Sequence, residues 1–105
     1  MASYTTIKFN FSQAKLQAQK LEAIAAEMRR TANQNFESAV SQLAGGWKGE
    51  SASLYLRKAE IVRNDILKTA RDLEAVAGSI RKVAQKVYNA EMEAKRLADE
   101  IARKG

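Results

Sequence analysis

The fold is decided by the stretch Gly45-Gly46-Trp47-Lys48-Gly49, where three of the chain's five glycines fall within five residues. Glycine adopts backbone angles that other residues avoid, so this clustering predicts a sharp reversal. The 105 residues include no proline, and nothing therefore removes a backbone donor or blocks a helix on either side of the turn. We expect a single domain over residues 1–105, with the turn at about 44–50.

The segment after the turn carries the clearest periodic pattern. Its apolar residues recur at alternating spacings of four and three, which is a heptad pattern sustained to the end of the chain. This pattern predicts a helix over about 51–103 with one face against neighbouring helices. The stripe consists of Tyr55, Ala59, Val62, Ile66, Leu73, Val76, Ile80, Val83, Val87, Ala90, Ala94, Leu97 and Ile101, with Thr69 as its one polar member. It is widened by Leu56, Ala70, Ala77 and Ala84.

The segment before the turn predicts a second helix, over about 11–43. Its apolar residues also follow spacings of three or four, and Gly45 offers a left-handed residue to close it. Residues 4–11 alternate apolar and polar, which predicts an extended arm, and Asn10 is the expected helix cap. Because the helix after the turn is the longer one, we expect it to project beyond its neighbour from Ala84 onward.

The predicted fold class is therefore all-α, an antiparallel two-helix hairpin. A hairpin has no third layer to cover the outer part of its apolar stripe, and exposed apolar area favours association. We expect dimerisation into a four-helix bundle, first as a homodimer and second as a heterodimer with a related hairpin. The predicted dimer interface comprises Leu21, Ile24, Met28, Leu73, Val76 and Ile80.

The composition argues against an enzyme. The chain has no cysteine and no histidine, which removes a thiol nucleophile, a histidine base and the usual zinc ligands. Asp65, Asp72 and Glu74 lie among basic residues on a predicted outer face. We therefore expect no catalytic residues, no metal and no cofactor.

The net charge of +6 raises the alternative of a basic helical protein that binds nucleic acid or acts as a structural coiled coil. The densest basic region comprises Lys68, Arg71, Arg81, Lys82 and Lys86. However, acids precede bases by four residues at Glu91/Lys95 and Glu100/Lys104, and by three at Glu60/Arg63. Such spacing favours ion pairs along a solvated helix face, so nucleic acid is the less favoured partner.

The turn and its surroundings resemble the WXG family of ESAT-like proteins, which are helical hairpins of about a hundred residues. The motif is Trp47-Lys48-Gly49 between two long helices, followed by small residues and then Tyr55. The resemblance implies a type VII (ESX) secretion substrate or carrier that works by protein–protein contact. It also implies a secretion ATPase, and in some cases a larger toxin, as partners.

The same resemblance implies export from the cytoplasm without a cleaved signal peptide. The N-terminal residues are mixed and polar, and no apolar run approaches the ~20 residues of a membrane span. By resemblance, Trp47 and Gly49 form part of the export signal. A second element, a tyrosine followed four residues later by an acid, is matched only in part, because Tyr88 is followed by Glu91 at a spacing of three.

Overall fold

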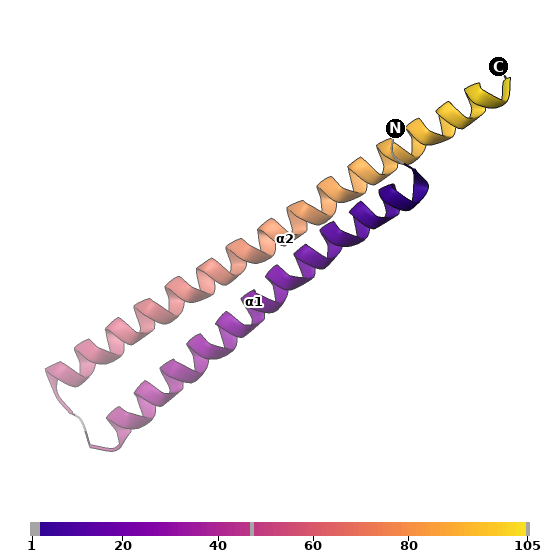
Figure 1. Cartoon of the computed structure of the whole chain (residues 1–105). Coiled ribbons are helices and arrows are strands. Elements are labelled where there is room, and N and C mark those ends of the chain that lie inside the picture. Colours follow the sequence, from indigo (N-terminus) through magenta and orange to yellow (C-terminus); the bar gives the residue numbers. More distant parts are fainter. Residues whose placement is uncertain (1–2, 47, 105) are drawn as a thin grey trace. The chain divides into compact units, whose positions relative to one another are not determined.

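The computed structural model describes residues 3–46 and 48–104, and these form two helices and no strand. Helix α1 spans Tyr4–Ala44 and helix α2 spans Glu50–Lys104. Figure 1 shows them running antiparallel on either side of one turn. The predicted all-α helical hairpin is confirmed. Within the described ranges, neither helix contains a segment long and apolar enough to span a membrane.

The chain divides into two compact units, and each pairs a segment of α1 with a segment of α2. Unit 1 comprises Met1–Leu21 and Ala75–Gly105, and unit 2 is the continuous segment Glu22–Glu74. Unit 2 includes the turn, and unit 1 includes both ends of the chain. The packing of each unit is described separately below.

The turn uses different glycines from the one expected. Gly46 and Gly49 have positive φ values of 144° and 97°, whereas Gly45 does not. The Gly45 amide instead donates to the Ser41 carbonyl at 3.1 Å, as in a regular helix. The Gly49 carbonyl accepts the first hydrogen bond of α2, from the Ser53 amide at 3.1 Å, so Gly49 is the N-cap residue of that helix.

The extended arm predicted for residues 4–11 was wrong, because this segment is the first part of α1. Ser3 caps the helix in place of Asn10: its Oγ accepts from the Thr6 amide at 3.2 Å. Ile7 is 1% exposed, and the half-buried Phe11 lies one turn later. Spacings of four, three and four connect Ile7 and Phe11 to Ala14 and Ala18. The helical period therefore prevails over the apparent alternation.

The earlier start of α1 also corrects the predicted overhang of α2. Within unit 1, the Tyr4 hydroxyl donates to Asp99 Oδ2 at 3.2 Å, and Lys95 Nζ donates to Asp99 Oδ1 at 3.0 Å. Helix α2 is thus accompanied by α1 as far as Asp99, far beyond Ala84.

The contacts at Asp99 predict a lowered pKa for its carboxyl group. The hydrogen bond from Lys95 is the largest cause, and the Tyr4 hydroxyl adds to it. A lowered folded-state pKa means that these contacts stabilise the fold fully above the ordinary carboxyl pKa of about 3.9, and that this stabilisation is lost as the pH falls through the lowered value.

An NMR titration of the Asp99 carboxyl carbon should give a midpoint below the ordinary value. Lys95→Ala should raise it, and Lys104→Ala, which removes a lysine paired with Glu100, should not. A wild-type midpoint at or above the ordinary value would contradict the contact.

Alanines form the inner seam between the paired segments. In unit 2 the buried residues are Ala25, Ala32, Ala39, Ala52 and Ala70, and in unit 1 they are Ile7, Ala18 and Ala77. Side chains this small allow two helices to approach closely and leave little room for larger ones. Consequently, large aliphatic residues of the heptad stripe lie beside the seam and not within it.

Candidate partner-binding surface

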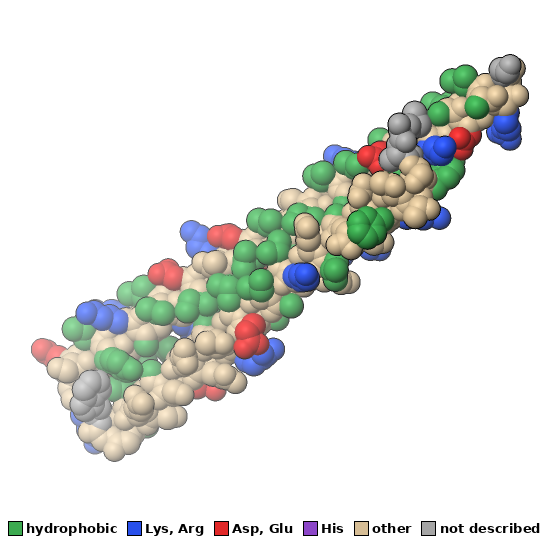
Figure 2. Space-filling view, in the orientation of Figure 1, with side chains coloured by type: hydrophobic (Ala, Val, Ile, Leu, Met, Phe, Trp, Pro, Cys, Tyr) green, Lys and Arg blue, Asp and Glu red, His purple; other side chains and the backbone are tan. Residues whose placement is uncertain are grey.

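Unit 1 contains an apolar groove of about 600 Å³ between the start of α1 and the later part of α2. Ile7 and Phe11 contribute from α1, and Val76, Val83 and Val87 contribute from α2. The three valines are 50%, 60% and 48% exposed. They lie seven and four residues apart, so they form one row along the helix. Figure 2 shows hydrophobic side chains gathered along both helices on the face in view.

The predicted signal residues Tyr88 and Glu91 both lie on this groove. The Tyr88 ring stacks on Phe11, with 4.5 Å between ring centroids and 29° between the ring planes. Both aromatic residues are half-buried, so Tyr88 is part of the packing between α1 and α2 in this unit. The structure therefore brings Tyr88 and Glu91 together at the edge of an apolar surface. Their contribution to export stays a prediction.

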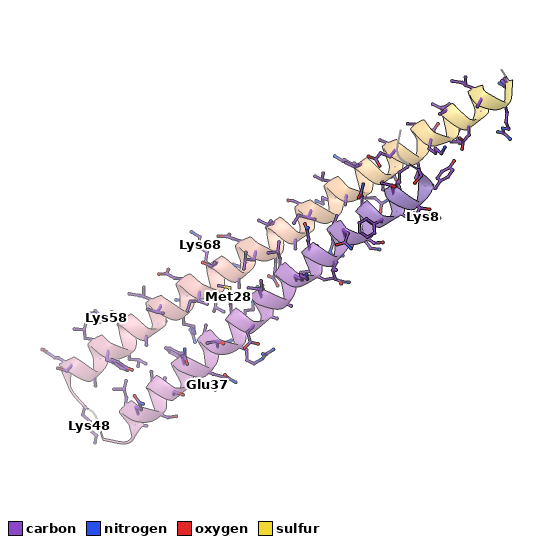
Figure 3. All side chains as sticks on the ribbon, viewed as in Figure 1. Lys8, Met28, Glu37, Lys48, Lys58 and Lys68 are labelled. Carbon is purple, nitrogen blue, oxygen red and sulfur yellow. The ribbon has the colours of Figure 1, made fainter. Side chains whose placement is uncertain are left out.

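Unit 2 contains a second apolar groove, of about 360 Å³, lined by Ile24 and Met28 of α1 and Ile66 of α2. Ile24 is 50% exposed, and Met28 is half-buried. Figure 3 labels Met28 on α1. Four of the six residues predicted for a dimer interface thus line grooves, namely Ile24 and Met28 here and Val76 and Ile80 in unit 1. The remaining two, Leu21 and Leu73, are half-buried.

A different kind of cavity, of about 370 Å³, also lies in unit 2, and it combines apolar and cationic residues. Its large apolar side chains are Phe36 of α1 and Val62 and Ile66 of α2, and Tyr55 adds an aromatic ring with a hydroxyl group. Lys58 and Arg63 supply positive charge, and no acid is among the lining residues. The Arg63 guanidinium carbon lies 4.0 Å from the centroid of the Phe36 ring, a cation–π contact.

A two-pronged ion pair connects the two helices within unit 2. Arg29 donates from both terminal nitrogens to the two carboxylate oxygens of Glu74, at 2.6 and 2.5 Å. This two-pronged hydrogen bonding raises the pKa of Arg29 above its ordinary value. Because both side chains are more than a third exposed, water screens the pair. Its main contribution is therefore to the alignment of the two helices, and less to their stability.

The predicted turn residues have different outcomes. Trp47 lies outside the described residues. Gly49 adopts positive φ and caps α2, which accounts for its presence on structural grounds. The sequence reasoning missed the cavity at Arg63, although a signal was present. Arg63 occupies the heptad position shared by Leu56, Ala70 and Ala77, so it is a cation in a row of buried or half-buried apolar residues.

The comparison with protein families identifies a PPE family model that matches residues 12–104. The predicted membership in the WXG family was therefore wrong, since the matching model describes a different family, although both are associated with ESX secretion. The three-residue turn motif and the hairpin were not specific enough to identify the family. No curated protein and no solved structure matches the chain.

Proposed function

Because this chain belongs to the PPE family, we propose that it is a non-catalytic substrate of a type VII (ESX) secretion system, exported in complex with a partner hairpin. PPE proteins are associated with ESX secretion in mycobacteria, where they pair with PE partners. Membership of this family supports both the secretion of the chain and its pairing with a partner hairpin. A role as a carrier for a larger toxin has no comparable support.

The exposed valine row of unit 1 is the observation that carries the pairing. Val76, Val83 and Val87 present branched aliphatic side chains to solvent beside an apolar groove. Burying one such side chain completely stabilises a complex by about 1.5–3 kcal/mol. These valines are already about half covered, so covering the row would gain part of that amount at each position. Among the residues lining this groove, Glu91 is the single charged one. An apolar helix pair would cover the row with little desolvation of charge.

A four-helix bundle follows from this geometry as the expected complex. A partner made of two antiparallel helices would lay an apolar stripe along the groove of unit 1. The sequence placed a homodimer first and a heterodimer with a related hairpin second. We favour the heterodimer, with a PE hairpin, because PPE proteins pair with PE partners.

Export can be tested in a mycobacterial host with functional ESX systems. The tagged chain, co-expressed with a PE hairpin that binds it, should accumulate in the culture filtrate. In an otherwise identical strain lacking the secretion ATPase, the chain should stay in the cells. A cytoplasmic protein without an export route, followed in the same fractions, controls for lysis. Equal amounts of the tagged chain in both filtrates, or retention in both strains, would contradict the proposal.

A further inference from the structure

The guanidinium of Arg63 has one buried nitrogen whose hydrogen-bonding capacity is unused. Its Nε is buried and has no hydrogen-bond partner among the described residues. One face of the group is covered by the Phe36 ring at 4.0 Å. The pair expected with Glu60 does not form in the part of the chain that the structure describes. A buried cationic donor without an acceptor costs free energy, and an incoming acceptor would recover it.

The surroundings specify the chemistry of that acceptor. Lys58 brings a second positive charge to the same cavity. Most of the other lining side chains, including Val62, are apolar, and Asn35 and Tyr55 add an amide and a hydroxyl group. Figure 3 shows Lys58 on α2. The Nε–H and a terminal N–H of arginine form a planar fork that matches the two oxygens of a carboxylate. The volume of about 370 Å³ is many times the ~30 Å³ share of one water molecule, so it has room for side chains.

We propose that Arg63 is a specificity-determining residue that receives an aspartate or glutamate from the partner hairpin. The partner's acid forms a two-pronged hydrogen bond with Arg63, and an apolar side chain one turn away fills the space beside Tyr55 and Val62. This inference rests on the proposed pairing with a hairpin partner. It adds a polar contact that selects among partners with a similar apolar stripe. A partner without the acid would leave the buried Nε of Arg63 without an acceptor.

The test measures binding of a PE hairpin that co-purifies with the wild-type chain. Arg63→Met keeps a long unbranched side chain and removes the charge, the donors and the guanidinium contact with Phe36. It should weaken the complex by about 30-fold or more, as expected for truncating one side of a buried charge pair. Arg71→Met is the matched control, since Arg71 is an exposed arginine on the same helix and does not line the cavity. It should leave the dissociation constant within about threefold of wild type.

The partner's acid is then identified by changing each of its aspartates and glutamates to the amide. One such change should weaken binding to the wild-type chain and have no further effect on binding to the Arg63→Met variant. The free Arg63→Met chain should unfold at the same temperature as wild type or higher, because an unpaired buried donor has been removed.

Three outcomes would overturn the inference in distinguishable ways. If no PE hairpin binds the wild-type chain, the proposed pairing fails and the role of Arg63 fails with it. If Arg63→Met binds as tightly as Arg71→Met, the pairing stands and Arg63 does not select the partner. If free Arg63→Met unfolds at a clearly lower temperature, Arg63 acts within the hairpin through its contact with Phe36.

Discussion

Replacing Val83 by aspartate is expected to abolish partner binding while the free chain stays folded. Val83 is 60% exposed in the free chain, so the substitution removes little internal packing. In the complex, the same position would place an unpaired carboxylate against apolar side chains, which is strongly unfavourable. We expect the affinity for a PE hairpin to fall by roughly 100-fold or more, as for a central anchor residue. Isothermal titration calorimetry measures the loss, and circular dichroism checks the fold.

Ile61→Asp is the matched control for this experiment. Ile61 is an exposed aliphatic residue of the same helix, at 54%, and it lies outside the grooves and the cavity described above. Its substitution should leave affinity nearly unchanged. If Val83→Asp and Ile61→Asp weaken binding equally, the valine row is not the surface that the partner covers.

Replacing Ala25 by leucine is expected to give the largest loss of stability. Ala25 is fully buried in the alanine seam of unit 2, and a leucine there would force α1 and α2 apart. We expect the free energy of unfolding to fall by about 1–3 kcal/mol, as for other overpacked cores. The thermal midpoint should then drop by roughly 4–8 °C for each kcal/mol. Chemical and thermal denaturation both measure the change.

The neighbouring Ala26 supplies a control with the same chemical change. Ala26 is exposed, so Ala26→Leu adds a side chain to solvent and should alter stability by less than ~0.5 kcal/mol. Equal stability of the two variants would mean that the helices tolerate a larger side chain in the seam. The close approach attributed to alanine would then be wrong.

The fold could be predicted from the sequence because its determinants are local and repetitive. Clustered glycines fixed the turn, and the heptad spacing fixed two helices. The limits of α1 could not be predicted as well, because Ile7, Phe9 and Phe11 fit an alternating pattern as readily as a helical one. Only packing decides between a strand and a helix here. In a strand all three side chains would lie on one face, but Ile7 is 1% exposed and Phe9 is 59% exposed, as on different faces of a helix.

The binding surface was predicted in part. The stripe predicted the exposed apolar row, but periodicity alone could not tell which edge of the stripe faces the other helix. The alanines at 70 and 77 take the inner position because they are small, and the valines at 76 and 83 stay outside. The contact of Arg63 with Phe36 joins residues far apart in sequence, and no local pattern specifies such a contact. The assignment to a family was misled by a three-residue motif that fits more than one kind of hairpin.

The mass of the assembly formed with a PE hairpin tests the central claim most directly. Native mass spectrometry of the co-expressed, co-purified chains should give a one-to-one complex, with a mass equal to 11.6 kDa plus that of one partner. The Val83→Asp chain, expressed in the same way, should appear without the partner. A wild-type chain that stays at 11.6 kDa, or that pairs with its own copy in preference to the PE hairpin, would contradict the account.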